Sequence, residues 1–430
     1  MDYLTTDLEL TAVADAIRAR GGTSSPLVYP SGFVSAISAI PAGGGGAEDD
    51  LVTRPSSLTA YANPRVESVG SYAFAQMSFL QSVSFPACRS VHTRAFYSCS
   101  KLKTVSFPQC SIVGAEAFYS CYSLTGAAFP ACVSVYDHAF YMCLSLSSVS
   151  FPSCTYLASY AFGNCSALTA AEFPACVSVS SSAFNGCKGL LSASFPACTS
   201  VYSGAFLNCT SLKEAYFPSC RTVGASAFQS CYALSGISFP ACTGLGDGAF
   251  RYCSSLSEVS FSTSQMTMGA YAFANCSGLK SARFPALSNA VGNHAFENCV
   301  NLLTAEFPSC RSVGTYAFSG CYRLQSVDVT ACSALGSYAF AYCSALPAIS
   351  LPACRAIESF AFSGCRSLMS LYLPGSSVAS LYAVGVFSNT PMSLSTLTGQ
   401  FGSIFVPLSL LAAYRSASRW SNYSSRFAGI

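Results

Sequence analysis

The dipeptide Ala-Phe recurs along most of the chain at a nearly constant interval. The spacing between its phenylalanines is 22 residues, apart from two 23-residue steps that end at Phe273 and Phe296. The fourteen copies are Phe74, Phe96, Phe118, Phe140, Phe162, Phe184, Phe206, Phe228, Phe250, Phe273, Phe296, Phe318, Phe340 and Phe362. A strict period in this range predicts a solenoid, in which each turn buries its apolar face only against its neighbours.

Each repeat can be written AF-x-x-C-x-x-L-x-x-V-x-F-P-x-C-x-x-V-x-x-x. Leu102, Val105 and Phe107 alternate like a short strand, and Pro108 ends that strand because proline cannot donate to a continuing ladder. Gly114 and its equivalents fall where a turn needs a permissive φ. The AF-x-x-C-x-x-L segment, with apolar residues three apart, predicts one helical or 3₁₀ turn. We therefore expect an α/β repeat solenoid with one short parallel strand and one helical turn per coil.

The repeat resembles the BspA-type leucine-rich repeat, whose units are similar to I-P-x-x-V-x-x-I-G-x-x-A-F-x-x-C-x-x-L. The resemblance covers about residues 64–374, three-quarters of the chain. It implies a leucine-rich-repeat solenoid. It leaves the function open, because such repeats occur in adhesins, in other surface proteins and in phage-encoded proteins.

The amino-acid composition excludes some classes of binding partner. Of the 430 residues, 51% are apolar and only 9% are charged, and the net charge of +3 is spread thinly, so we expect no nucleic-acid partner. No window reaches the roughly 20 apolar residues of a membrane-spanning helix, so no membrane insertion is expected. The N-terminus lacks the pattern of a secretory signal. We expect synthesis in a bacterial cytoplasm, where the 24 cysteines stay reduced.

The cysteines form two columns eleven residues apart. The AF-x-x-C column has thirteen members from Cys99 to Cys365, with Met77 in the first turn, and the F-P-x-C column has eleven, with Ser264 and Leu287 in place of two. This spacing supplies no close ligand pair, so we expect no metal and no other cofactor. Disulfides are the alternative, but side chains in register on coils about 4.8 Å apart miss the Cβ separation of about 3.8 Å that a disulfide needs. We expect reduced, buried thiols that act as small apolar side chains.

The two 23-residue turns are also the turns that lack the second cysteine. We infer that cysteine at F-P-x-C fills the inside of a corner that is one residue short, and that the longer corner no longer needs it. A local change of curvature near residues 261–296 is expected to follow.

The sequence that precedes the repeats predicts a separate structural unit. Residues 1–42 predict a small helical module that attaches the chain to a particle component or to a second copy, because two short helices alone bury too little to be stable. A Gly-rich linker follows at 43–50. Much of the module is similar to N-terminal modules of tail-associated structural proteins in phages and prophages of Gram-positive bacteria.

The repeats are expected to form a solenoid over 51–374. Residues 375–430 then predict an irregular last coil and a helical cap, in which Trp420, Tyr423 and Phe427 plug the open end. This ending resembles the closing segment of prophage-borne proteins with the same repeat.

The sequence offers two candidate binding surfaces and no catalytic motif. It has no G-x-S-x-G, H-E-x-x-H or phosphate-loop pattern, so we expect no enzyme. Tyrosines among serines and glycines are typical of adaptable recognition surfaces, although tyrosines beside Ala-Phe could equally shield the core. The candidates are Tyr97, Tyr119, Tyr122 and Tyr141 on the helical-turn side, and Glu214, Tyr216, Arg283 and Tyr372 on the strand side.

The sequence favours a non-enzymatic recognition or structural protein of a phage or prophage tail, located in the virion, that presents its solenoid to a glycan or protein on the host surface. A BspA-like bacterial surface adhesin is one alternative, and the absence of a signal pattern counts against it. An intracellular protein-interaction scaffold is the other alternative.

Overall fold

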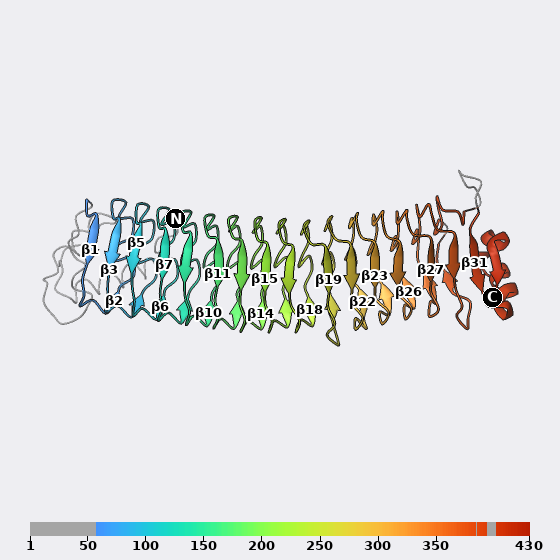
Figure 1. Ribbon diagram of the computed structural model, residues 1–430, viewed down its shortest axis with the longest axis horizontal. Helices are drawn as coiled ribbons and strands as arrows, with labels where there is room; N and C mark the ends of the chain where they lie inside the picture. Colours follow the sequence, from blue (N-terminus) through green and yellow to red (C-terminus); the bar gives the residue numbers. More distant parts are fainter. Residues whose placement is uncertain (1–56, 384, 394–400) are drawn as a thin grey trace, which may run out of the picture.

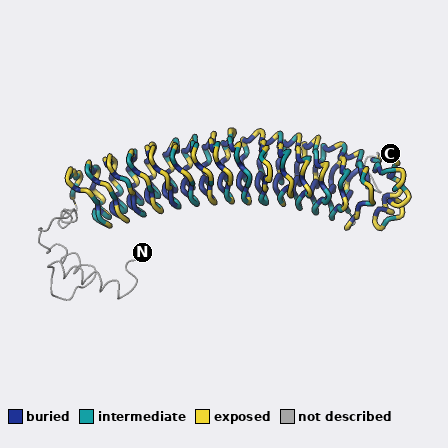
Figure 2. The backbone as a smooth tube through the Cα atoms, turned by 90° about the horizontal axis from the view of Figure 1, so that it is seen from below, coloured by how far each residue is buried: buried dark blue, intermediate teal, exposed yellow. Residues whose placement is uncertain are grey.

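The computed structural model describes residues 57–383, 385–393 and 401–430. These residues form one long, gently curved solenoid of about sixteen coils (Figures 1 and 2). The sequence-predicted helical module at 1–42 and the predicted linker at 43–50 lie outside the described residues.

Every coil from that of β1 to that of β29 contributes two short strands, so the expectation of one strand per coil is wrong. The longer strands are β1 (Ala60–Ala62), β3 (Ser82–Ser84), β5 (Thr104–Ser106), β7 (Gly126–Ala128), β9 (Ser148–Ser150), β11 (Ala170–Glu172), β13 (Ser192–Ser194), β15 (Glu214–Tyr216), β17 (Gly236–Ser238), β19 (Glu258–Ser260), β21 (Ser281–Arg283), β23 (Thr304–Glu306), β25 (Ser326–Asp328), β27 (Ala348–Ser350), β29 (Ser370–Tyr372) and β31 (Ser403–Val406). The two-residue strands are β2 (Ser68–Val69), β4 (Ser90–Val91), β6 (Ile112–Val113), β8 (Ser134–Val135), β10 (Tyr156–Leu157), β12 (Ser178–Val179), β14 (Ser200–Val201), β16 (Thr222–Val223), β18 (Gly244–Leu245), β20 (Thr267–Met268), β22 (Ala290–Val291), β24 (Ser312–Val313), β26 (Ala334–Leu335), β28 (Ala356–Ile357) and β30 (Ser380–Leu381).

The strands pair in parallel between successive coils and join equivalent residues. Val83 pairs with Val105, and Val91 pairs with Val113. The two-residue strands form a ten-stranded sheet from β2 to β20 and a five-stranded sheet from β22 to β30. The break between these sheets falls at the two 23-residue coils, so the extra residues interrupt the ladder where the sequence predicts a change of curvature.

The helical turn predicted for AF-x-x-C is also wrong. Tyr97 N–H donates to the Arg94 carbonyl of the same coil at 3.1 Å, whereas Ser98 N–H donates to the Tyr119 carbonyl of the next coil at 2.7 Å. This alternation of amides runs from Arg94 to Cys99 and closes successive β-turns. Arg94 and Ser98 both have a φ of 56°, in the left-handed region that an α-helix excludes. Apolar residues three positions apart are compatible with successive β-turns as well as with a helix.

Residue 114 must be a glycine because the backbones of two coils approach each other closely there. The predicted reason, a turn that needs a permissive φ, does not apply. A Cβ at this position would lie 2.7 Å from the carbonyl carbon of His92 and 2.8 Å from the amide nitrogen of Thr93, both in the preceding coil. The φ of Gly114 lies outside the left-handed region. The absence of a side chain therefore lets the backbones of two coils meet.

Two columns of phenylalanine run through the core, together with buried leucine, valine, alanine and cysteine side chains. The buried residues are dark blue along the backbone tube of Figure 2. In the Ala-Phe column, Phe96 stacks on Phe118 with ring centroids 5.1 Å apart. In the Phe-Pro column, Phe107 stacks on Phe129 at 5.6 Å. The columns meet edge to face, as in the Phe96–Phe107 pair at 5.9 Å. Both offset stacking and edge contact are favourable arrangements for aromatic rings, so the columns stabilise the rod along its length.

The C-terminal residues close the end of the solenoid. They form η2 (Leu408–Leu410), α3 (Leu411–Ser416), η3 (Trp420–Arg426) and β32 (Phe427–Gly429). Phe387 extends the Ala-Phe column by stacking on Phe362 at 5.8 Å, and the rings of Trp420 and Tyr423 lie 6.2 and 5.2 Å from Phe387. Trp420 Nε1–H donates to the Ala379 carbonyl at 2.7 Å, which satisfies the buried indole.

All 24 cysteines are buried free thiols, and nearly all of them donate a hydrogen bond. In the AF-x-x-C column, Cys121 Sγ–H donates to the carbonyl oxygen of Phe96 in the preceding coil at 3.2 Å. In the F-P-x-C column, Cys110 Sγ–H donates to the carbonyl of Ile112 in its own coil at 3.1 Å. Burial raises the pKa of Cys99 to about 12. The cysteines are thus donors as well as the packing elements that the sequence predicts.

The longer corners still need a side chain inside them, contrary to the inference from the sequence. Leu287 takes the place of the missing cysteine and is fully buried. In the other 23-residue coil, Met266 is fully buried two residues after Ser264. A longer corner therefore encloses more space, and a larger apolar side chain fills it.

Candidate recognition surface

Tyr97, Tyr119 and Tyr141 form a stack that the sequence analysis brings together correctly. Tyr97 lies 5.1 Å from Tyr119, and Tyr119 lies 5.2 Å from Tyr141, with the rings within 24° of parallel. The Arg94 guanidinium lies 5.5 Å from the Tyr97 ring, and the Tyr141 ring lies so close to Gly163 that a Cβ there would be 2.8 Å away. The three rings therefore cover one another's faces and present mainly their edges to solvent.

The Arg94 side chain holds one end of this stack in place. Its guanidinium donates to both carboxylate oxygens of Glu116, at 2.8 and 2.9 Å, and to the Tyr72 hydroxyl at 2.9 Å. The hydrogen bond to Glu116 raises the pKa of Arg94. Burial raises the pKa of the middle ring, Tyr119, and the neighbouring Tyr97 adds to that effect. These contacts join the side chains to one another, as is expected of a cluster with a structural role.

The other predicted site residues are not members of the stack. Tyr122 is a separate tyrosine that is 40% exposed. Glu214 and Tyr216 occupy the two outward positions of β15, on either side of buried Ala215. Arg283 on β21 pairs with Glu306 on β23 at 3.1 Å.

Tyr372 on β29 stacks on Phe405 of β31 at 4.7 Å. The eight predicted residues therefore do not converge on one site.

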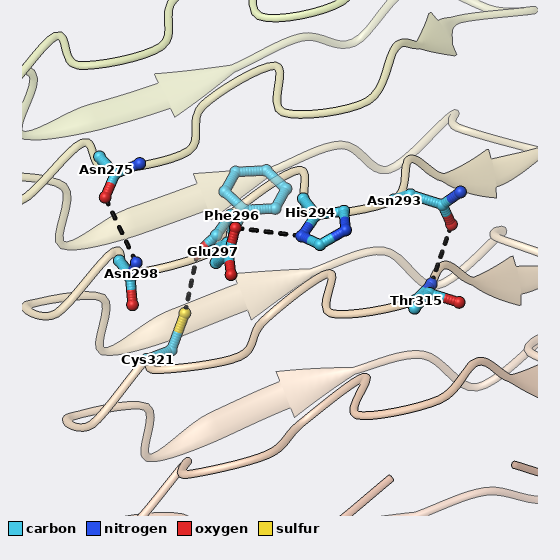
Figure 3. Close-up of polar contacts among 8 residues, drawn as sticks. All are labelled: Asn275, Asn293, His294, Phe296, Glu297, Asn298, Thr315 and Cys321. Carbon is cyan, nitrogen blue, oxygen red and sulfur yellow. Dashed lines mark hydrogen bonds and ion pairs between the residues drawn. The ribbon is translucent and has the colours of Figure 1, made fainter. Parts of the chain in front are cut away.

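A second aromatic stack is not among the predicted site residues. It comprises Tyr271, His294, Tyr316, Tyr338 and Phe360, with ring centroids 4.4–5.0 Å apart. Figure 3 shows His294 Nδ1 directed toward the Glu297 carboxylate, 3.0 Å away. These residues all stand two positions before the phenylalanine of Ala-Phe, and that column of the repeat is the signal that could have revealed them.

An exposed apolar patch lies on the side of the two-residue strands and was also missed. It spans four successive coils, from β6 to β12, and its side chains are 41–49% exposed: Ile112, Val133, Tyr136, Tyr156 and Val177. The register places Ile112 and Tyr156 on either side of Ser134, and the Tyr136 and Tyr156 rings meet edge to face at 6.0 Å. In the sequence, the signal is a large apolar residue where neighbouring repeats have serine or threonine or, beside Tyr136, glycine and alanine.

Two hollows on the surface of the described residues are open to solvent. One lies over β5, β7 and β9, and the other over β1, β3 and β5. Serine, threonine, glycine, alanine and valine side chains make up most of their lining. Within the described ranges, no three His, Cys, Asp or Glu side chains come together as a metal site would require. In that same part of the chain, no helix is long and apolar enough to cross a membrane.

The sequence matches the family described as the BspA type leucine rich repeat region. The matches fall at residues 67–191, 133–256, 177–303 and 268–392, so together they extend over most of the chain. The chain belongs to the BspA-type leucine-rich repeat family. The repeats of this BspA-type protein are those that its sequence predicts, although each coil is built from two strands and a series of β-turns. A search of curated proteins found no match to it.

Among solved structures, the BspA-type chain is similar to a leucine-rich repeat protein from Bacteroides ovatus, at 21% identity and a TM-score of 0.61, over 86% of this chain and 92% of that one. A leucine rich cell surface protein from Faecalibacterium prausnitzii matches at 21% identity and a TM-score of 0.39, over 75% and 89%. A leucine-rich repeat protein from Eubacterium ventriosum matches at 20% identity and a TM-score of 0.41, over 72% and 89%. At 21% identity, the likeness to the Bacteroides ovatus protein shows the fold alone.

Proposed function

We propose that this protein is a non-enzymatic recognition protein that binds a protein on the host surface through the apolar patch over β6–β12. The observation that carries the proposal is the contiguity of five exposed apolar side chains on four successive coils. Contiguous apolar patches with a polar rim mark interaction sites on soluble proteins. Arg89, on the coil before the patch, and Arg221, two coils after it, supply part of such a rim.

The arrangement of the tyrosines favours a protein partner over a glycan. A sugar ring that stacks on an aromatic side chain needs an open ring face. The faces of Tyr97, Tyr119 and Tyr141 are taken up by their neighbours, by Arg94 and by Gly163. The patch, in contrast, combines aliphatic and aromatic side chains, which is the composition of the buried centre of protein–protein interfaces.

We further propose that the solenoid is carried on a phage or prophage tail, attached through residues 1–42. This step rests on the resemblance of those residues to tail-associated modules, and they lie outside the described part of the chain. A bacterial surface adhesin with the same patch is the alternative, and an intracellular interaction scaffold is a third possibility. Detection of the protein in purified particles separates the first of these from the other two.

The binding proposal can be tested with the labelled full-length chain and a panel of intact Gram-positive cells. We expect binding to some cells, loss of binding after protease treatment of the cell surface, and loss of binding in the Ile112→Ser/Tyr156→Ser variant. Serine is the chosen replacement because Ser134 and Ser178 occupy the same register positions. Tyr202→Ser is the matched control, since Tyr202 is 52% exposed and lies outside the patch.

Two different outcomes would contradict the proposal. Binding that survives protease but is lost after periodate oxidation of the cells would identify a glycan and rule out a protein partner. Equal loss of binding in the patch variant and in Tyr202→Ser would remove the patch from the proposal. Circular dichroism of each variant confirms that the solenoid is still folded.

A further inference from the structure

Arg251 lies against aromatic rings of the turns that follow Ala-Phe. Its guanidinium carbon lies 4.9 Å from the ring centroid of Tyr252 in its own coil and 4.9 Å from that of Tyr271 in the next coil. Tyr271 is the first ring of the second aromatic stack, so Arg251 lies at the end of that stack. Both rings attract the cation and screen part of it from water.

Arg94 has similar aromatic neighbours but differs from Arg251 in one respect. Its guanidinium carbon lies 5.5–5.7 Å from two tyrosine rings, and its nitrogens donate to both carboxylate oxygens of Glu116 in the next coil. Within the described residues, Arg251 has no carboxylate partner. The next coil places Tyr271 at the repeat position that Glu116 occupies, two residues before the phenylalanine of Ala-Phe.

The Arg251 side chain also has donors without an acceptor. Its Nε atom is buried and makes no hydrogen bond, and it is one of only two such side-chain atoms among the described residues. Its two terminal nitrogens are not buried and have no acceptor in that part of the chain. Asp247, the nearest acid along the sequence, is already engaged, since its Oδ1 accepts the amide of Ala270 at 2.8 Å. A partly desolvated positive charge without a counter-charge attracts an anion.

A second donor lies beside this arginine. Gln229 occupies the repeat position of Arg251 in the preceding coil, and its Oε1 accepts the hydroxyl of Ser226 at 3.0 Å. The Gln229 amide nitrogen has no acceptor in the described part of the chain. Gly248 lies close to both side chains, since a Cβ there would stand 3.5 Å from Gln229 Oε1 and 3.7 Å from the Arg251 Cβ. Because Gly248 has no side chain, this space stays open.

We propose that Arg251 and Gln229 bind a carboxylate, and that an acidic peptide segment of a protein partner supplies it. Arg94 pairs with Glu116 through Nε and one terminal nitrogen. In Arg251 the Nε atom is buried, so the carboxylate binds the two terminal nitrogens, and the Gln229 amide donates a further hydrogen bond. The site lies beyond the last coil of the apolar patch and does not depend on that patch.

The surroundings favour a peptide over a sugar acid or a free carboxylate ion. A sugar ring that stacks on tyrosine needs an open ring face, but the Tyr271 ring has Arg251 at 4.9 Å and His294 at 4.4 Å. The two surface hollows lie over strands β1 to β9, in other coils, so a free ion at Arg251 would be held on an open surface and would bind weakly. A peptide presents several carboxylates at a high local concentration.

The test measures binding of a fluorescently labelled hexaglutamate peptide to the full-length protein by fluorescence anisotropy at low salt. We expect saturable binding that weakens at least about tenfold in Arg251→Gln, because a charge-assisted pair is lost. Arg355→Gln is the matched control, since Arg355 is exposed and has no aromatic ring against it within the described ranges, and it should bind as the parent does. Oligogalacturonate, which carries its carboxylates on sugar rings, should bind much more weakly than hexaglutamate.

A second variant, Gly248→Glu, keeps Arg251 and closes the site from within. Positions 248 and 251 stand in the same relation as His294 and Glu297, which pair at 3.0 Å within one coil. We therefore expect the new carboxylate to pair with Arg251 and to weaken peptide binding at least about tenfold, whereas Gly248→Gln should stay within about threefold of the parent. Both variants should fold by circular dichroism, because Tyr271 in the same column of the repeat has a φ of 58°, close to the 62° of Gly248.

Four outcomes would overturn the proposal. The first is a parent protein that shows no saturable binding of hexaglutamate. The second is Arg251→Gln that binds the peptide as tightly as the parent or as Arg355→Gln. The third is equal binding by Gly248→Glu and Gly248→Gln. The fourth is oligogalacturonate that binds as tightly as hexaglutamate, which would replace the peptide by a sugar acid.

Discussion

The thiol of Cys121 donates its proton to the carbonyl oxygen of Phe96, one coil earlier, over 3.2 Å. The same oxygen accepts the amide of Cys99, also at 3.2 Å, so it serves a bond within its own coil and a bond from the next. The relation recurs between Cys143 and Phe118 at 3.1 Å. A cysteine at this position is small enough to pack beside the phenylalanine column, and its thiol also links two successive coils. An alanine has no thiol and could not make this link.

Replacing Cys121 by alanine should therefore destabilise the solenoid. The variant loses a weak hydrogen bond and leaves a small cavity, which together are expected to cost about 1–2 kcal/mol. Urea unfolding followed by circular dichroism measures the difference. Ser123→Ala, at a half-buried position of the same coil, should change stability by less than about 0.5 kcal/mol. Equal stabilities of the two variants would contradict the role given to the thiol.

The buried thiols should make the protein sensitive to alkali. Burial raises the pKa of Cys99 and Cys176 to about 12 and that of Cys198 to about 11, from 9.0. Below about pH 8 these thiols are protonated in both the folded and the unfolded chain, so they add no pH dependence. Between about pH 9 and 12 the unfolded chain releases these protons and the folded chain keeps them, so stability falls as pH rises.

The alkaline loss is expected to be steep because the thiols act together. Each contributes up to about 1.4 kcal/mol per pH unit within that window. The measurement is the urea midpoint at pH 7, 8, 9 and 10 in the presence of a reductant. A midpoint at pH 10 as high as that at pH 7 would show that the thiols ionise without unfolding.

Truncation within a phenylalanine column should be among the most damaging single changes. The Phe206 ring stacks on Phe184 and Phe228 at 5.2 and 5.1 Å, and it is fully buried. Phe206→Ala is expected to cost about 3–5 kcal/mol. Phe79, which is half exposed and whose ring centroid lies 4.7 Å from Lys101 Nζ, provides the comparison, and Phe79→Ala should cost less than about 1 kcal/mol. Thermal unfolding of the two variants should separate them clearly.

The tyrosine stack should matter for stability and not for binding. Tyr119 contacts a ring on each side, and each aromatic pair is worth about 0.5–1.5 kcal/mol, so Tyr119→Ala is expected to lose about 1–3 kcal/mol. Tyr122→Ala, at an exposed position in the same coil, should be nearly neutral. Glycan-array binding should be the same for both variants. Glycan binding that disappears only in Tyr119→Ala would instead give the stack a recognition role.

The repeat and its core could be predicted from the sequence because they rest on period alone. Phe96 and its equivalents recur every 22 residues, and the alternation of Leu102, Val105 and Phe107 marks a strand. Residues 104–106 do form β5, and both phenylalanine columns are buried. Membership of the family follows from the same residues.

Other features could not be predicted, for identifiable physical reasons. β6 has only two residues, too few for alternation to be visible. An apolar spacing of three does not reveal that Arg94 and Ser98 adopt positive φ, because that depends on bonds to the next coil. The candidate recognition surface was harder to predict than the fold. Sequence places Tyr97, Tyr119 and Tyr141 in one column, but only the structure shows that their rings hide one another's faces.

The hydrogen bonds between coils run along the long axis of the rod (Figure 1). A force applied at the two ends therefore pulls each coil away from the next. The interfaces between coils carry this force in series, so they should give way one after another. A released coil of 22 residues extends to roughly 7–8 nm, against about 0.5 nm in the folded stack. The molecule should lengthen in near-equal steps under load, as an energy-absorbing tether, and not fail in a single break.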